Sequence, residues 1–246
     1  MFDAHLHIID PRFGLQANNG YLPPPFTVAD YRDRVAGLGV TGGAVVSGSF
    51  QGFDQRYLRA ALQELGPSFV GVTQIPATSA DAEILALDAI GVRAVRFNVA
   101  RGGSADLRDL DRLARRVHEI ADWHVELYID AAGLPELYPV LSRLPAVSVD
   151  HLGLSRDGLP ALLAMVDAGA FVKATGFGRI EFDPEPVMRQ ILDANPHALV
   201  FGTDLPSTRA RRPFADSDLT SLGAWMNERE QENVLWRNAA DLYRLG

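Results

Sequence analysis

The chain has 246 residues, of which 47% are hydrophobic and 22% are charged, as is usual for a folded domain without long disordered segments. Its 23 Lys and Arg residues against 31 Asp and Glu give a net charge of −8, which argues against nucleic acid or an anionic membrane as a partner, because both are bound by basic surfaces. Cysteine is absent, which excludes disulfides and thiolate chemistry, and the lack of a signal-peptide pattern or a long apolar run favours a cytoplasmic protein.

The first predicted strand carries two histidines on one face. Residues 2–8 read Phe-Asp-Ala-His-Leu-His-Ile, and side chains alternate between the faces of a strand, so His5 and His7 are expected to point the same way. Imidazole can act as a metal ligand, a proton carrier or a hydrogen-bond donor near neutral pH. Two structural histidines in a first strand are the alternative, but a His-x-His pair at a strand end favours a functional site.

Beyond this strand the chain alternates between strand and helix patterns. A long loop, Asp10 to Thr27, is rich in Pro, Gly and Asn, and loops of this length are often functional. Thr27 is the predicted N-cap of a helix over 28–38 that ends at Gly39. Further strands are predicted at 43–46, 69–72, 92–97, 125–129, 146–150, 171–174 and 198–201, and further helices near 54–65, 80–90, 107–121, 134–143, 157–168, 184–194, 217–228 and 231–243.

Eight strands, each followed by a helix, predict an α/β protein with parallel strands: a (β/α)₈ TIM barrel forming a single domain over 1–246. A doubly wound open sheet is the alternative, weakened because no Gly-x-Gly-x-x-Gly turn follows the first strand. The active site of a TIM barrel lies where its strands end. Polar residues gather at those predicted ends, namely His5, His7, Ser47, Ser49, Gln74, Arg96, Asn98, Tyr128, Asp130, His151, Lys173, Thr175, Arg179 and Asp204.

Short motifs along nearly the whole chain resemble the amidohydrolase superfamily. His5-x-His7 on the first strand, His151 on the sixth and Asp204 on the eighth carry the general resemblance. The branch of 2-pyrone-4,6-dicarboxylate lactonases is the more similar one, on the motifs Gly20-Tyr21-Leu22-Pro23, Val95-Arg96-Phe97-Asn98, Leu127-Tyr128, Asp150-His151, Lys173-Ala174-Thr175 and Gly202-Thr203-Asp204. The resemblance implies an enzyme that hydrolyses a cyclic ester.

The catalytic residues that this resemblance implies suit lactone hydrolysis. Asp204 is the expected base that takes a proton from water. His5, His7 and His151 are the expected donors to the oxygen that becomes negative in the tetrahedral intermediate, and loss of one such donor costs about 3 kcal/mol. The alternative for Asp204 is a helix N-cap before Pro206.

Arginines are the expected binders of acidic groups on the substrate, because a guanidinium pairs with a carboxylate through two hydrogen bonds. By the resemblance, Arg96 and Arg179 fall at carboxylate-binding positions, and Tyr21, Ser49 and Tyr128 at other substrate contacts. An ion pair in the barrel mouth is the alternative for Arg96, and a solvated loop charge is the alternative for Arg179.

The chain departs from the lactonase pattern in two places. A further basic residue is expected after the Arg-Phe-Asn segment, and Arg101 lies there but one position early. Leu205-Pro206-Ser207 stands where Trp-Pro-His is usual. Lactone hydrolysis remains the expected reaction. The residues that would bind a second acidic group of the substrate are left open. A nearby cluster, Arg209, Arg211 and Arg212, could line the mouth of the barrel or be solvated, and solvated side chains are the favoured expectation.

Metal-independent catalysis is favoured over a metal centre. The fourth predicted strand offers no Lys or Glu to bridge two ions, and the fifth offers Tyr128 where a ligand histidine would be expected, which disfavours a binuclear site. A single zinc ion on His5, His7 and Asp204, with or without His151, remains chemically open.

Three other functions stay open beside lactone hydrolysis. They are a zinc-dependent decarboxylase or hydratase of a dicarboxylic acid, a lactone isomerase, and a non-enzymatic scaffold, which would require the polar strand ends to be dispersed. The expected partner is a small anionic lactone. Oligomeric state and physiological direction cannot be read from the sequence.

Overall fold

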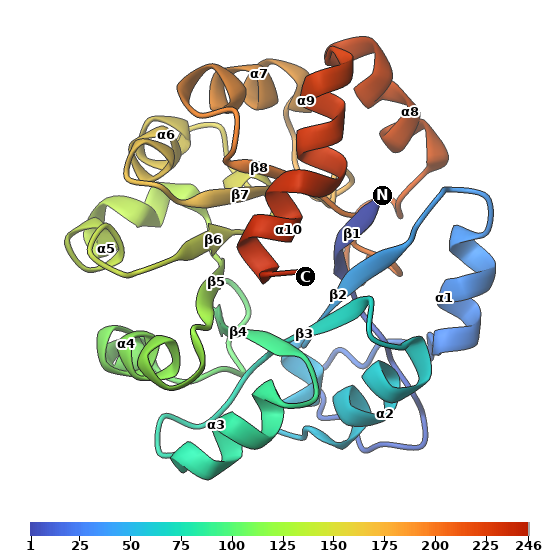
Figure 1. The fold of residues 1–246 in the computed structure, drawn as a ribbon, viewed down its shortest axis with the longest axis vertical. Coiled ribbons are helices and arrows are strands. Elements are labelled where there is room, and N and C mark those ends of the chain that lie inside the picture. The colour runs from blue at the N-terminus through green and yellow to red at the C-terminus, as the bar shows by residue number, and fades with distance from the viewer. Residues whose placement is uncertain (246) are drawn as a thin grey trace.

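The computed structural model describes residues 1–245 and shows eight parallel strands arranged as a barrel inside a ring of helices (Figure 1). Neighbouring strands pair in chain order from β1 to β8. The backbone N–H of Asp204 donates to His5 O, and that of His7 to Leu205 O, both at 2.7 Å, which joins the end of β8 to β1. This confirms the (β/α)₈ barrel. The strands are β1 (Phe2–Leu6), β2 (Gly42–Val46), β3 (Phe69–Thr73), β4 (Val92–Asn98), β5 (His124–Tyr128), β6 (Val147–Val149), β7 (Phe171–Ala174) and β8 (Leu199–Phe201).

The helices follow the predicted patterns closely. They are α1 (Val28–Val35), α2 (Arg56–Leu65), α3 (Asp81–Asp88), α4 (Leu110–Ala121), α5 (Leu134–Leu141), α6 (Leu159–Asp167), α7 (Pro184–Ala194), α8 (Asp216–Trp225), α9 (Glu228–Glu232) and α10 (Asn238–Tyr243). The predicted N-cap is confirmed, since Thr27 Oγ1 accepts from Asp30 N–H at 3.3 Å. No helix within residues 1–245 combines the length and the apolar character needed to cross a membrane.

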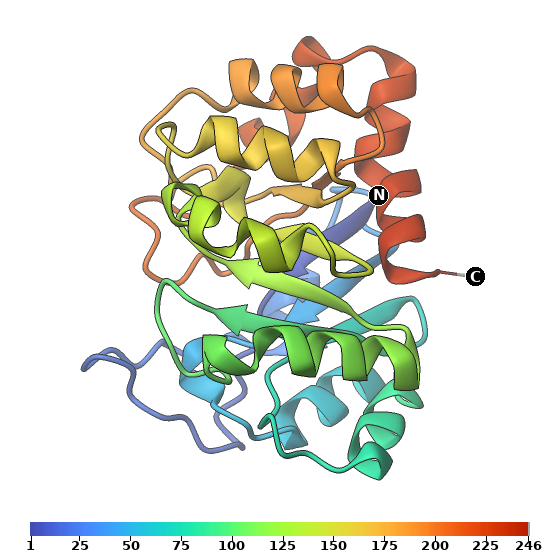
Figure 2. The same cartoon turned by 90° about the vertical axis from the view of Figure 1, so that its left-hand side faces the viewer.

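The predicted end of the first helix is wrong. This helix ends at Val35 instead of Leu38, where Gly37 and Gly39 turn the chain with φ angles of 86° and 71°. The predicted helix over 231–243 is confirmed, since residues 228–243 are helical throughout, with a π-helical turn, Asn233–Arg237, between α9 and α10. The pair α9 and α10 lies beside the N-terminus, across the end of the barrel where the strands begin (Figure 2).

The interior of the barrel changes character along its axis. Where the strands begin it is apolar, filled by Phe2, Ala4, Ala44, Val46, Val72, Ala94, Val200 and Tyr243. Toward the strand ends the buried side chains are charged or polar, among them His5, Arg96, Glu126, Asp150, Lys173 and Asp204. Buried charges need partners. The arrangement of those partners therefore defines the candidate site.

Candidate active site

Three histidines surround one carboxylate at the ends of β1, β6 and β8. Asp204 Oδ1 lies 3.8 Å from His5 Nε2, 3.7 Å from His7 Nε2 and 4.0 Å from His151 Nε2. All four residues are buried. The structure thus brings together the four residues proposed as catalytic, where a scaffold protein would have left them dispersed.

Asp204 is held by an unusual backbone conformation directly after β8. Its φ of 61° lies in the left-handed region, which aspartate tolerates better than most residues but which still costs about 1–3 kcal/mol. The hydrogen bond from its own N–H to His5 O helps to offset that cost. The loop is therefore shaped to direct this carboxylate at the histidines.

Arg179 is the direct ion-pair partner of Asp204. Its Nε donates to Oδ2 at 2.7 Å and its Nη2 to Oδ1 at 3.0 Å. Burial, the largest single effect, raises the pKa of Asp204, but Arg179, His151 and His7 together outweigh it and hold that pKa well below its usual range. Gly176 permits this approach, because a Cβ there would lie 2.7 Å from His151 Nδ1 and 3.1 Å from Asp204 Oδ2. The predicted alternative of a solvated loop charge is wrong for Arg179.

Polar contacts on the far side of each ring orient the histidines, as hydrogen bonds for His7 and His151 and as a close carboxylate for His5. His7 Nδ1 lies 2.7 Å from Val46 O, a pure acceptor, so this nitrogen carries a proton. His5 Nδ1 lies 3.3 Å from Asp150 Oδ1, and His151 Nδ1 lies 2.8 Å from Thr175 Oγ1. Burial lowers the pKa of His5 well below its usual value and that of His151 to about 4, so both rings are neutral at pH 7.

Arg96 belongs to a buried ion-pair network beneath the histidines. Its Nη2 donates to Asp150 Oδ2 at 2.5 Å, its Nη1 to Ser47 O at 2.7 Å, and its Nε lies 3.4 Å from Glu126 Oε1. Lys173 also pairs with Glu126. Burial, followed by repulsion from Asp150, raises the pKa of Glu126 to about 7. The charge of Arg96 is thus largely balanced inside the barrel.

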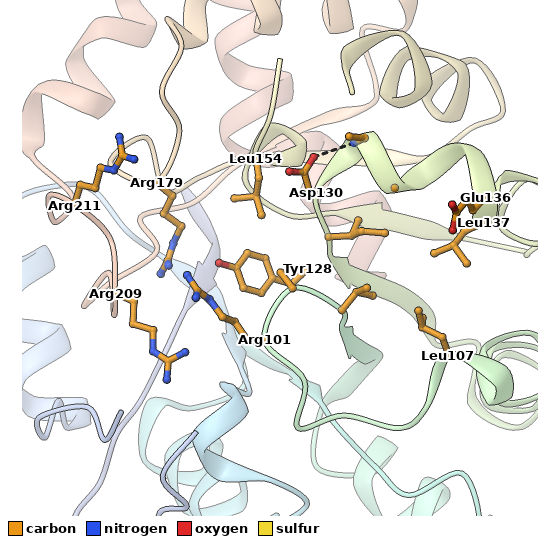
Figure 3. Close-up of a pocket in the computed structure, with 15 residues that line it drawn as sticks. Arg101, Leu107, Tyr128, Asp130, Glu136, Leu137, Leu154, Arg179, Arg209 and Arg211 are labelled. Carbon is orange, nitrogen blue, oxygen red and sulfur yellow. Dashed lines mark hydrogen bonds between the residues drawn. The ribbon is translucent and has the colours of Figure 1, made fainter. Parts of the chain in front are cut away.

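Two connected chambers lie above this network. The inner chamber has a volume of about 30 Å³ and its walls include His7, Ser49, Arg96, Tyr128, His151 and Arg179. A cavity of about 10–15 Å³ already holds one water molecule, so this space holds very few. The outer chamber has a volume of about 710 Å³ and opens beside it, with Arg101, Tyr128, Arg179 and Arg209 forming part of both walls (Figure 3).

Of the predicted substrate contacts, Tyr128, Arg101 and Arg179 lie at this junction, whereas Tyr21 lines neither chamber. Tyr128 is buried, and the Arg96 guanidinium lies 5.4 Å from the centre of its ring. Ser49 lies in the wall of the inner chamber. Tyr21 contributes from the long loop as the platform under Arg209, whose guanidinium carbon is 4.3 Å from the ring centre. Arg101 is exposed and lines both chambers.

Arg209 adopts the alternative that the sequence left open for its cluster, because it is half-buried and lines both chambers. The favoured expectation of a solvated side chain is wrong for Arg209. Arg211 lines the outer chamber and pairs with Glu181, and Arg212 pairs with Asp218. The sequence feature that indicates a place in the site is the position of Arg209 in the loop after the eighth strand, because such loops form the mouth of a TIM barrel.

His5, His7 and Asp204 could hold one divalent ion, because they offer ligand atoms within 4.8 Å of one another. The proton on His7 Nδ1 leaves its Nε2 free for a metal, as in many metal sites. However, Arg179 already donates to both oxygens of Asp204. An ion at this carboxylate would have to displace a buried guanidinium or lie beside its charge, so the residues present do not fit a metal well.

Comparison with known proteins agrees with this architecture. The chain is 27% identical to a 2-pyrone-4,6-dicarboxylate hydrolase of Comamonas testosteroni, over 88% of this chain and 80% of the relative. It is 25% identical to a 4-sulfomuconolactone hydrolase of Hydrogenophaga intermedia, over 98% and 88%. Among solved structures, a protein of Agrobacterium tumefaciens superposes with a TM-score of 0.87 at 24% identity, covering 100% of this chain and 96% of that one.

The same barrel is found in a crystal structure from Acinetobacter baumannii, named as a 2-pyrone-4,6-dicarboxylic acid hydrolase with citric acid bound. Its TM-score is 0.85 at 22% identity, and 99% of each chain is covered. The amidohydrolase family matches residues 2–245. With a barrel, strand-end histidines and a terminal aspartate in the order that the motifs predict, the chain is an enzyme that belongs to the amidohydrolase family.

Proposed function

We propose that this enzyme hydrolyses a small carboxylated lactone similar to 2-pyrone-4,6-dicarboxylate. The observation that carries the proposal is the convergence of three imidazoles and one guanidinium on Asp204. Asp204 is buried behind His7, His151 and Arg179, which line the inner chamber. Two relatives are named as hydrolases of lactones that bear acidic groups, which supports the substrate class.

Substrate binding begins at Arg179. The inner chamber, about 30 Å³, is too small for a lactone ring while Arg179 remains on Asp204. A carboxylate on the substrate offers the guanidinium an equivalent paired contact. Arg179 therefore exchanges the carboxylate of Asp204 for that of the substrate, which opens the inner chamber. Because Arg179 contributes most among the groups that lower the pKa of Asp204, the exchange also makes Asp204 more basic.

Water activation follows at Asp204. A water molecule beside Oδ1 lies within reach of His7 Nε2, which is 3.7 Å from that oxygen. With its proton on Nδ1, His7 offers Nε2 as a hydrogen-bond acceptor and so orients the water. Asp204 takes one proton while the water oxygen attacks the lactone carbonyl. Of the three histidines, His7 is thus assigned to the water instead of to the carbonyl.

His151 is assigned to the carbonyl oxygen. A neutral ring that accepts from the Thr175 hydroxyl at Nδ1 carries its proton on Nε2, the nitrogen that faces Asp204. This N–H stabilises the negative oxygen of the tetrahedral intermediate. When the intermediate collapses, the ring C–O bond breaks and the leaving oxygen receives the proton held by Asp204. The product is the open-chain acid, and Asp204 returns to its carboxylate form.

Catalysis without a metal is part of the proposal, because Arg179 supplies the positive charge that Asp204 would otherwise require from an ion. The grouping of His5, His7 and Asp204 is the observation that favours the rival, a zinc-dependent decarboxylase or hydratase of a dicarboxylic acid. A lactone isomerase differs from both by yielding a rearranged ring and no new acid.

A proton-release assay separates these functions. A panel of carboxylated and uncharged lactones is incubated with purified enzyme, with and without a chelator, and the products are identified by mass. The proposal expects acid release from carboxylated lactones that persists in chelator. Loss of acid release in chelator that zinc restores would refute catalysis without a metal, and no acid release from any lactone would contradict the lactonase and leave the zinc-dependent rival open. A product isomeric with the substrate would identify an isomerase.

A further inference from the structure

Two of the five arginines that line the chambers have no acidic partner among residues 1–245. Arg96 pairs with Asp150 and Glu126, Arg179 pairs with Asp204, and Arg211 pairs with Glu181. Among residues 1–245, by contrast, no carboxylate lies within 4.0 Å of the guanidinium of Arg101 or Arg209. In a protein of net charge −8, two neighbouring unpaired arginines at the mouth create a local positive field that attracts anions.

Arg209 is fixed in place. Its Nη1 donates to Asn18 Oδ1 at 3.0 Å, its Nη2 donates to Asn18 O, and its guanidinium stacks on Tyr21. Asn18 Nδ2 in turn donates to Arg101 O at 3.0 Å. Asn18 therefore links the long loop to the loops that follow β4 and β8. A guanidinium held in this way loses little freedom when it binds a ligand.

The position of the two arginines is equally specific. Arg101 and Arg209 line both chambers, together with Tyr128 and Arg179 (Figure 3). Any substituent that extends from a ring near Asp204 into the outer chamber must pass them. Beyond this junction the outer chamber is partly apolar, with Leu107, Ile129, Leu137 and Leu154 in its wall. Its volume of about 710 Å³ leaves ample room for a substituent.

We propose that Arg209 and Arg101 form an outer anion subsite, which binds a second acidic group carried on a short arm that projects from the lactone ring past Tyr128. Arg209 is the specificity-determining residue of this subsite, Asn18 is its positioning residue, and the apolar wall contacts the arm. The inference rests on the proposed function for the lactone ring, but the subsite itself can be tested by binding alone.

The test uses unreactive aromatic acids and calorimetric titration. 3-(2-Carboxyethyl)benzoate carries one carboxylate on the ring and one on an arm, and 3-propylbenzoate has the same ring and a similar arm without the second charge. We expect wild-type enzyme to bind the first at least about tenfold more tightly, because a charge-assisted bidentate pair is gained. In Arg209→Gln the preference should fall below about threefold while the affinity for 3-propylbenzoate stays unchanged.

Three further variants sharpen the test. Arg209→Lys keeps the charge and should retain part of the preference, and Asn18→Ala should reduce it because the guanidinium is no longer held. Arg108→Gln is the matched control, since Arg108 lies on the same loop as Arg101 but pairs with Asp106 and lines neither chamber. It should behave as wild type.

The results of this binding test can be distinguished from those of the lactone hydrolysis assay. Equal affinity of wild-type enzyme for the two acids, no measurable binding of either, or a full preference in Arg209→Gln would each overturn the outer subsite. If no lactone is hydrolysed although the preference is present and depends on Arg209, the reaction class is refuted and the anion subsite stands.

Discussion

Arg179 donates hydrogen bonds to both carboxylate oxygens of Asp204, at 2.7 and 3.0 Å. One carboxylate is therefore both the proposed base and the partner of the residue proposed to bind substrate. The two tasks cannot be carried out by the same contact. An acidic group on the substrate resolves the conflict by taking Arg179, so binding and activation of the base are coupled in this site.

Replacing the base should separate chemistry from binding. We expect Asp204→Asn to lower kcat by about 10²- to 10⁴-fold, the usual contribution of a general base. Binding of a carboxylated inhibitor should be kept or tightened, because Arg179 no longer has an anionic partner. Steady-state kinetics and calorimetry measure the two effects. Asp218→Asn is the control, since Asp218 forms the same paired contact with Arg212 outside the chambers; wild-type-like kcat in Asp204→Asn would refute the assignment.

Arg179→Lys tests the role of paired hydrogen bonds. Lysine keeps the charge but cannot form the planar two-bond contact, so we expect KM for a carboxylated lactone to rise about tenfold or more. For an uncharged lactone KM should hardly change. Arg189→Lys, which alters a paired contact with Glu230 on the outside of the barrel, serves as control. An equal rise of KM for charged and uncharged lactones would contradict carboxylate binding by Arg179.

Thr175→Val tests how His151 is oriented. Valine matches the shape of threonine but removes the hydroxyl that lies 2.8 Å from His151 Nδ1. Without that partner the Nε2–H form of the ring is no longer favoured, and we expect kcat to fall about tenfold, in line with about 1–1.5 kcal/mol for one hydrogen bond. KM should stay close to its original value. Thr175→Ser should restore kcat, and failure of serine to do so would point to lost packing instead.

The buried histidines should make the protein sensitive to mild acid. Burial lowers the pKa of His124 to about 3, whereas the unfolded chain protonates it near 6.5, so its contribution to stability is complete above about pH 6.5 and is lost progressively as the pH falls toward 3. Between pH 8 and pH 5 this costs about 2 kcal/mol. We expect His124→Phe to raise the free energy of unfolding more at pH 5 than at pH 8, as measured by denaturant titration.

Packing favours the same substitution. His124 lies against Tyr243, with ring centres 5.3 Å apart, and both of its ring nitrogens are buried without a hydrogen-bond partner among the described residues. A phenyl ring removes two unsatisfied polar atoms at a modest cost in volume. The exposed His197, changed to Phe, controls for loss of a histidine at the surface. Equal stability gains for His124→Phe at pH 5 and pH 8 would contradict the titration argument.

The sequence by itself determined the architecture and the positions of the groups proposed to be catalytic. Alternating strand and helix patterns are local, and eight of them at this length specify the barrel. The rule that the strand ends of a barrel meet then places His5, His7, His151 and Asp204 together, because position along a strand determines position along the barrel axis. In the structure these four residues do lie together, and the longest of the three distances from a histidine Nε2 to Asp204 Oδ1 is 4.0 Å, for His151.

Only the tertiary structure decided which charges pair. Arg96, Arg179 and Arg209 are alike in sequence, yet one joins an internal network, one binds the base and one is left without an acidic partner. The partner of each arginine depends on loop conformations, such as the positive φ of Arg209 and the close approach at Gly176. It also depends on contacts between distant parts of the chain, such as the hydrogen bond between Arg209 and Asn18, which are 191 residues apart. Local patterns carry no information about such contacts, since a side-chain pair forms only after the backbone has brought two distant loops together.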